Sequence, residues 1–115
     1  MSSVDEGRIA ALIRSFSDHE PPFSSLGTAF FVDTETTRRL VEFGAKAVSQ
    51  LIEGLNAPDP KVAIYCAYCL RQIGDRAALP ALREARERYL AHEPKGEYDF
   101  SVISAIGQSE EALNR

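Results

Sequence analysis

Two cysteines, Cys66 and Cys69, have the Cys-x-x-Cys spacing, which makes them the first candidates for chemistry in the chain. A redox pair of this form has its first thiol at the N-terminus of a helix, where the helix dipole lowers the thiol pKa. Here both cysteines fall on the apolar side of a run with helical spacing, well inside that run. Cysteine at such positions packs as a small hydrophobic residue. We therefore expect two reduced core residues and no catalytic residue among them.

The two histidines raise the question of a metal site, since two cysteines and two histidines are a common ligand set for structural zinc. His19 and His92 lie far from the cysteines along the chain, one on each side of them, and both belong to expected loops. Zinc ligands usually come in closely spaced pairs. The chain also has no glycine-rich phosphate loop and no nucleophile elbow. We expect no metal, no bound cofactor and no enzymatic activity.

The charge distribution bears on the class of partner. The chain has 115 residues and a formal net charge of −4. The first 36 residues hold all of this excess, while the acids and bases of the remainder balance. Phosphate binding needs clustered lysine and arginine in excess, so nucleic acid is not an expected partner. No apolar run is long enough to cross a bilayer, and the acidic first residues do not resemble a secretory signal. A cytoplasmic protein with no membrane association is the expectation.

The element pattern is helical throughout. Apolar residues recur with helical spacing, and proline, glycine and capping residues separate the runs. Asp33 or Thr34 is expected to cap one helix, Asp59 another with Pro60 at its first position, and Ser109 a short final turn. The expected helices cover residues 4–16, 34–43, 45–55, 60–73, 78–90 and 98–106. Between the first two helices, residues 18–33 carry several aromatic and aliphatic side chains, and we expect them to pack as a covering loop.

The helical pattern repeats along the chain. A shift of about 30 residues aligns Leu40 with Leu70 and Gly44 with Gly74, and a further shift of about 33 aligns Leu70 with Ile103. Periods of this length, with helical spacing inside each unit, are typical of stacked helical repeats. The sequence predicts one all-α domain over 1–115. Residues 1–33 form an N-terminal helix and aromatic capping loop, and residues 34–115 form about two and a half helical hairpins.

One unit resembles a known family. The segment Cys-Leu-Arg-Gln-Ile at 69–73, followed by Gly-Asp-Arg-Ala-Ala-Leu-Pro-Ala-Leu at 74–82, is similar to HEAT-like repeats of the phycobilin-lyase type. The resemblance covers 61–90 best and extends more loosely over 34–55 and 97–113. It implies a short right-handed α-solenoid. The chain departs from the pattern at Ala63, where these repeats usually have arginine.

Stacked repeats of this kind bind other molecules through side chains on one face. We expect a scaffold or adaptor that binds a protein partner through its second helices. A small acidic inhibitory or immunity-type protein is the alternative, and a bilin lyase-like enzyme is a third. Tyr65 and Tyr68 lie away from the cysteine stripe, where they either pack on the neighbouring repeat or belong to the partner surface. The predicted partner-binding residues are Lys46, Gln50, Glu53, Tyr65, Tyr68, Arg76, Arg83 and Glu87.

The end of the chain suggests a second contact. The last unit has only Ala112 and Leu113 as apolar cover. We therefore expect Phe100, Ile103 and Ile106 to be partly exposed, and a homodimer through the C-terminal repeat is possible on this basis.

Overall fold

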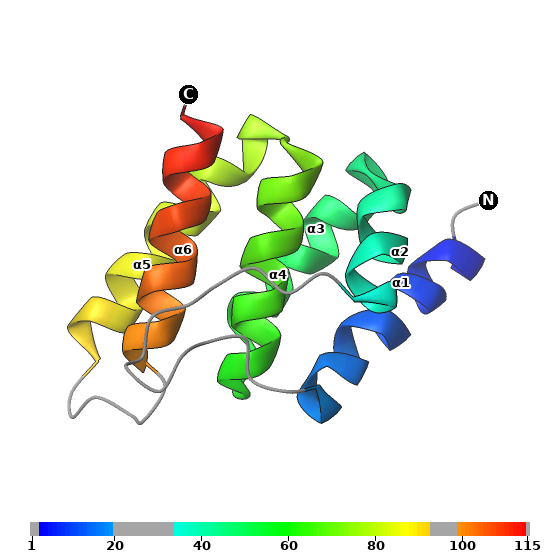
Figure 1. Ribbon diagram of the computed structural model, residues 1–115, viewed down its shortest axis with the longest axis horizontal. Coiled ribbons are helices and arrows are strands. Elements are labelled where there is room, and N and C mark those ends of the chain that lie inside the picture. Colours follow the sequence, from blue (N-terminus) through cyan, green and yellow to red (C-terminus); the bar gives the residue numbers. More distant parts are fainter. Residues whose placement is uncertain (1–2, 20–33, 93–98, 115) are drawn as a thin grey trace.

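The computed structural model describes residues 3–19, 34–92 and 99–114, all helices and their connections, with no strand among them. Helices α2, α4 and α6 stand side by side in one row (Figure 1), and α3 and α5 lie behind that row. Helix α1 lies at the end of the row, beside α2 and α3. The elements are α1 (Ser3–Ser15), η1 (Phe16–Asp18), α2 (Glu35–Phe43), α3 (Ala45–Gly54), α4 (Pro60–Ile73), η2 (Arg76–Ala78), α5 (Leu79–Ala91) and α6 (Asp99–Leu113). The all-α repeat architecture is confirmed.

The predicted helix boundaries depend on local chemistry, and most of them are confirmed. Of the two candidates before α2, Thr34 is the cap: its hydroxyl accepts from the Thr37 amide, and the Thr37 hydroxyl accepts from the Thr34 amide. Asp59 caps α4, with Pro60 at the first position. Gly74 ends α4 in the left-handed conformation at φ 78°, which glycine adopts without steric cost.

Helix α6 differs from the prediction. We expected a helix that ends near Ile106 and a separate final turn opened by Ser109, whereas α6 is continuous to Leu113. Ser109 is buried inside the helix, and its hydroxyl lies 2.8 Å from the carbonyl oxygen of Ala67 in α4. Gly107 therefore does not end its helix as Gly44 and Gly74 do, because the packing of α6 on α4 continues beyond Gly107, at Ser109. The third unit has one helix within the described residues.

Helix α4 is the centre of the core. Every residue from Val62 to Leu70 is buried, although the apolar pattern predicted a stripe on one side only. Helices α2 and α6 flank α4 in its row, α3 packs behind it, and η1 lies against it. The middle of a helix surrounded in this way has no solvent-facing side, and this arrangement explains why even its aromatic residues are buried.

The N-terminal helix α1 packs on both α2 and α3. Of the predicted covering loop, only Asp18 and His19 belong to the described residues. The other apolar residues assigned to it, Phe23, Leu26, Phe30, Phe31 and Val32, lie outside them. Across the described helices, none combines the length and the apolar character that a membrane span requires.

Candidate protein-binding surfaces

The predicted surface residues of α3 face the N-terminal helix. The ammonium of Lys46 lies 3.4 Å from the Asp5 carboxylate, and the Gln50 amide donates to the carbonyl oxygen of Glu6 at 3.1 Å. Both side chains therefore hold α1 on α3, a role that the repeat pattern did not predict. Lys46 keeps most of its side chain exposed and Gln50 is half-buried. Glu53, also exposed, lines a groove of about 420 Å³ between α1 and the turn after α3.

The predicted surface residues of the next unit lie on the open side of α5. Arg83 and Glu87 are four residues apart on this helix and both are exposed. Arg76 is exposed as well, but it belongs to the short helix η2, because Asp75 caps that turn before α5 begins. The shift of 30 residues that aligns Gly44 with Gly74 also aligns Lys46 with Arg76, so it pairs a residue inside a helix with one in a turn. The predicted face divides into an α3 part that contacts α1 and an α5 part that remains open.

The structure corrects the placement of Tyr65 and Tyr68 among the partner-binding residues. Tyr65 is 1% exposed and Tyr68 is 0% exposed. The Tyr65 ring stacks on Phe16 of η1, with ring centroids 4.6 Å apart and an angle of 4° between the planes. Burial excludes the partner-surface interpretation of these tyrosines, and the ring on which Tyr65 stacks belongs to η1 and not to a neighbouring repeat. The spacing of the residues could not decide this, since η1 comes from a distant part of the sequence.

The thiols occupy the core. Both Cys66 and Cys69 are fully buried, and Cys66 lies where α3 and α4 approach closely. Burial raises the pKa of the Cys69 thiol to about 12. Burial and, to a lesser degree, the neighbouring Cys69 raise the pKa of the Cys66 thiol well above its ordinary value. Both groups therefore stay protonated at neutral pH, which makes them poor nucleophiles and poor metal ligands.

The two histidines have different environments. The Nδ1 atom of His19 lies 2.9 Å from the carbonyl oxygen of Ser15, and its ring packs edge-on against Phe16 and Tyr65. The Nδ1 atom of His92 lies 3.1 Å from a carboxylate oxygen of Asp99. No group of three or more histidine, cysteine, aspartate or glutamate side chains with the geometry of a metal site occurs within residues 3–19, 34–92 and 99–114.

The last helix of the row presents apolar side chains to solvent. Phe100 is 63% exposed and Ile103 is half-buried, as the sequence predicted for both. The prediction for Ile106 was wrong, because this side chain is 0% exposed. Helices α4 and α5 both pack on α6, and Ile106 lies on the side that they cover.

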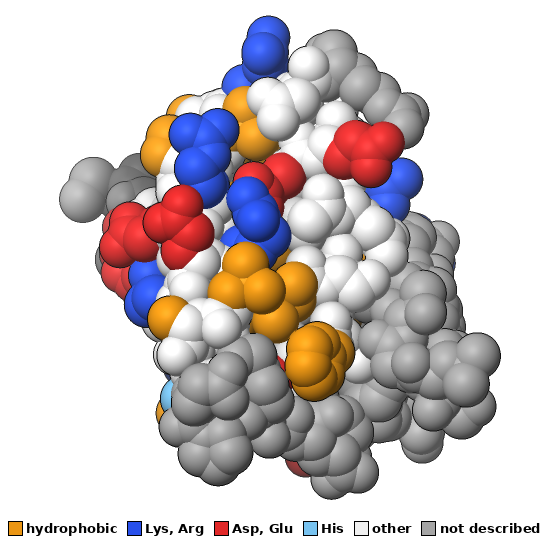
Figure 2. Space-filling model, turned by 90° about the vertical axis from the view of Figure 1, so that its left-hand side faces the viewer, with side chains coloured by type: hydrophobic (Ala, Val, Ile, Leu, Met, Phe, Trp, Pro, Cys, Tyr) orange, Lys and Arg blue, Asp and Glu red, His pale blue; other side chains and the backbone are white. Residues whose placement is uncertain are grey.

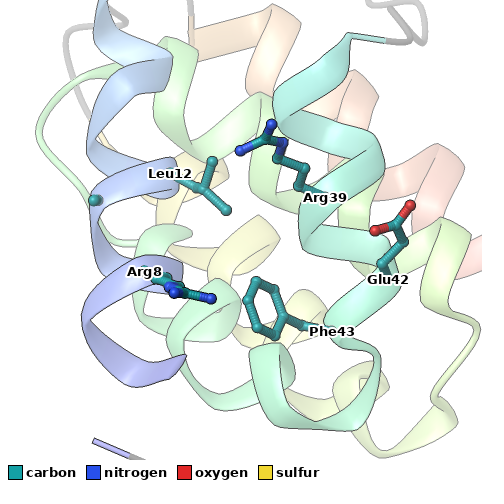
Figure 3. A pocket seen from close by; sticks show the side chains of 6 residues that line it. Arg8, Leu12, Arg39, Glu42 and Phe43 are labelled. Atoms are coloured by element: carbon teal, nitrogen blue, oxygen red, sulfur yellow. The ribbon is translucent and has the colours of Figure 1, made fainter. Parts of the chain in front are cut away.

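A second surface, which the sequence analysis did not identify, lies between α1 and α2. Arg8, Leu12, Arg39 and Phe43 line a groove of about 770 Å³ there (Figure 3), together with Ala11 and Glu42. The sequence did contain a pattern that could have indicated this groove, since each helix contributes an arginine followed four residues later by a large apolar residue. The packing of α1 on α2, which brings the two pairs together, was not evident from their spacing.

The comparisons with known proteins concern one part of the chain. Residues 62–87 match the family model described as PBS lyase HEAT-like repeat. The matched residues run from the start of α4 into α5, and lie within the unit that the sequence pattern singled out. No curated protein and no solved structure matches the chain.

Proposed function

We propose that this chain, whose residues 62–87 match a HEAT-like repeat, is a non-catalytic scaffold or adaptor that binds protein through the open face of its last unit. The open face consists of the outward side of α6, with Phe100 and Ile103, and the adjoining exposed side of α5, with Arg83 and Glu87. A second copy of the chain is the simplest occupant, because one self-complementary patch then forms the whole contact.

The observation that carries this proposal is a comparison of equivalent positions. Shifting the chain by 33 residues aligns Ala67 with Phe100 and Leu70 with Ile103. In α4 both positions are 0% exposed, and the carbonyl of Ala67 receives the Ser109 hydroxyl of α6. These positions of α4 lie in a helix that has a neighbour on each side. In α6 the equivalent Phe100 is 63% exposed and Ile103 is half-buried, so α6 presents the surface on which a further helix would stack.

The surroundings of this surface fit a protein partner. Figure 2 shows hydrophobic side chains gathered near the middle of this end of the molecule, with charged side chains of both signs beside them. Leu90 adds a second exposed apolar side chain at the end of α5. An apolar centre with a charged rim is the usual organisation of a protein interface.

The residues that could have supported catalysis are used structurally. The thiols are buried and protonated, and His19 packs against Phe16 and Tyr65. These contacts favour a binding role for the fold over chemistry at any of these residues.

Sedimentation of two matched variants tests the proposal. Phe100→Glu and Val4→Glu each place a charge at a strongly exposed apolar position, 63% and 62% exposed, at opposite ends of the row. We expect the wild type to form a dimer at high concentration, Val4→Glu to do the same, and Phe100→Glu to sediment as a monomer. A wild type that remains monomeric at all concentrations, or a Phe100→Glu variant that still dimerises, would contradict the use of this face for self-association.

A pull-down from native lysate with the same two variants distinguishes an adaptor from an inhibitory protein. Several clients lost together in Phe100→Glu indicate an adaptor. A single stoichiometric basic client indicates the inhibitory alternative, and binding that persists in Phe100→Glu excludes the α6 face.

A further inference from the structure

The two helices that form the groove, α1 and α2, each contribute one arginine and one large apolar residue to it. Arg8 and Leu12 come from α1, and Arg39 and Phe43 come from α2. In Figure 3 the Arg8 side chain extends toward Phe43, and the Arg39 side chain extends toward Leu12. The two helices therefore place a guanidinium at each end of an apolar floor. Leu12 and Phe43 are only partly buried, so this floor is accessible to a ligand.

The charges in the groove are available for binding. Arg8 is exposed and forms no ion pair within the described part of the chain. Arg39 pairs with Glu35 at 2.7 Å, but 61% and 71% of these side chains are exposed, and pairs of this kind contribute little free energy. The carboxylate of Glu42 points away from the gap between the helices (Figure 3). The groove therefore has one guanidinium from each helix beside an apolar floor, in a chain that as a whole carries net negative charge.

We propose that this groove binds an acidic peptide segment in which one large apolar side chain is flanked by carboxylates. The apolar side chain packs on Leu12 and Phe43, and a carboxylate on each side pairs with Arg8 or Arg39. Arginine favours this role because its planar guanidinium donates two hydrogen bonds to one carboxylate. A guanidinium at each end of the floor suits a ligand with two separated carboxylates, which a peptide presents and a simple fatty acid does not.

This site is distinct from the proposed α6 face. The groove lies between α1 and α2, and α6 lies at the other end of the row. A Phe100→Glu variant should therefore bind the peptide as the wild type does, and the two proposals succeed or fail separately.

Two capped, fluorescently labelled peptides serve as probes, Gly-Ser-Asp-Glu-Phe-Glu-Asp-Ser-Gly and the same peptide with lysine at each acidic position. Fluorescence anisotropy on the full chain should detect binding of the acidic peptide alone, and the affinity should weaken as salt increases. The double variant Arg8→Glu with Arg39→Glu should lose about tenfold or more in affinity for the acidic peptide. The same variant should gain affinity for the lysine peptide.

The controls separate the groove from general charge effects. Arg76→Glu with Arg88→Glu makes the same change of net charge at exposed positions of η2 and α5, and should bind the acidic peptide as the wild type does. Replacing phenylalanine by alanine in the peptide should weaken binding through loss of the floor contact. Backbone amide shifts in NMR spectra should change along α1 and α2.

Three results would overturn the proposal. One is equal binding of the acidic peptide to the wild type and to the Arg8→Glu, Arg39→Glu variant. Another is amide shifts that map away from α1 and α2. The third is displacement of the bound peptide by dodecanoate at lower concentration than by unlabelled peptide, which would assign the groove to a lipid carboxylate.

Discussion

Helices α4 and α6 occupy equivalent places in successive units but differ in how much of their surface is buried. In α4 every residue from Val62 to Leu70 is buried, whereas in α6 the buried residues alternate with half-buried ones and Phe100 is 63% exposed. Helix α4 has a neighbouring helix on both sides in its row. Within the described residues, α6 has a neighbouring helix of the row on one side, which is α4. The burial of a repeat position therefore depends on the next unit as much as on its own residue.

The largest expected effect concerns equivalent residues of the two helices. Leu70 is 0% exposed in α4, so Leu70→Ala should lower the free energy of unfolding by about 2–5 kcal/mol. Ile103 is half-buried at the equivalent position, so Ile103→Ala should cost about 1–2 kcal/mol. Urea denaturation measures both values. Equal costs at the two positions would mean that α4 and α6 are in equivalent environments.

The second effect concerns two glycines. A Cβ atom at Gly54 would lie 2.3 Å from the Sγ atom of Cys66, whereas one at Gly107 would meet no atom within 4 Å. Gly54→Ala should therefore destabilise the fold by about 1–3 kcal/mol, as overpacking does. Gly107→Ala should stabilise α6 by about 0.5–1 kcal/mol, because alanine favours a helix interior. Thermal melts distinguish these opposite signs.

A double variant tests whether the contact with Cys66 causes the destabilisation expected for Gly54→Ala. Removing the sulfur with Cys66→Ala should abolish most of the destabilisation by Gly54→Ala, so the two changes should not be additive. Additive costs would indicate that Gly54 is needed for a reason other than its contact with Cys66.

The third effect is the pH dependence of stability. The pKa of both thiols is raised by burial, that of Cys69 to about 12, while an unfolded thiol ionises near about 8.5. The resulting stabilisation is complete below the unfolded pKa and is lost as the pH rises toward the folded value. The free energy of unfolding should fall by about 1–2 kcal/mol between pH 7 and pH 9.

The matched control for the thiols is Cys66→Ala with Cys69→Ala. This variant should lose most of the decline between pH 7 and pH 9 in urea denaturation. A decline of the same size in the variant would assign it to other groups.

The smallest effect concerns the contact between α6 and α4. The Ser109 hydroxyl lies 2.8 Å from the Ala67 carbonyl oxygen, and Ser109→Ala should cost about 0.5–1.5 kcal/mol. Ser104 lies on the open side of α6 and is half-buried, where its hydroxyl accepts from the Gln108 amide. Ser104→Ala should change the stability less than Ser109→Ala does, as measured by chemical denaturation.

The features that could be predicted from the sequence depend on residues close together in the chain. Thr34, Asp59 and Gly74 determine helix ends through their own side chains or backbone, so their roles were readable from position alone. The same reasoning failed at Ser109, because its hydroxyl bonds to a helix 42 residues away in sequence. The end of α6 therefore required knowledge of α4.

The candidate surfaces divide in the same way. Arg83, Glu87 and Phe100 could be placed on the surface, because an amphipathic helix shows its solvent side in its spacing. Tyr65 also lay off the expected apolar stripe, but η1 covers that side of α4 and Phe16 stacks on its ring. Lys46 and Gln50 were expected on an open face, and they contact Asp5 and Glu6 instead.

The sequence by itself determined the helical units, their period and most of their caps, because these follow from local hydrogen bonding and from hydrophobic spacing. Only the tertiary structure decided which sides of those helices reach solvent. It buried the middle of α4 on all sides, brought Arg8 and Arg39 to opposite ends of one groove, and left Phe100 exposed. Exposure depends on which elements pack together, and in this chain the deciding contacts join segments that are far apart in the sequence.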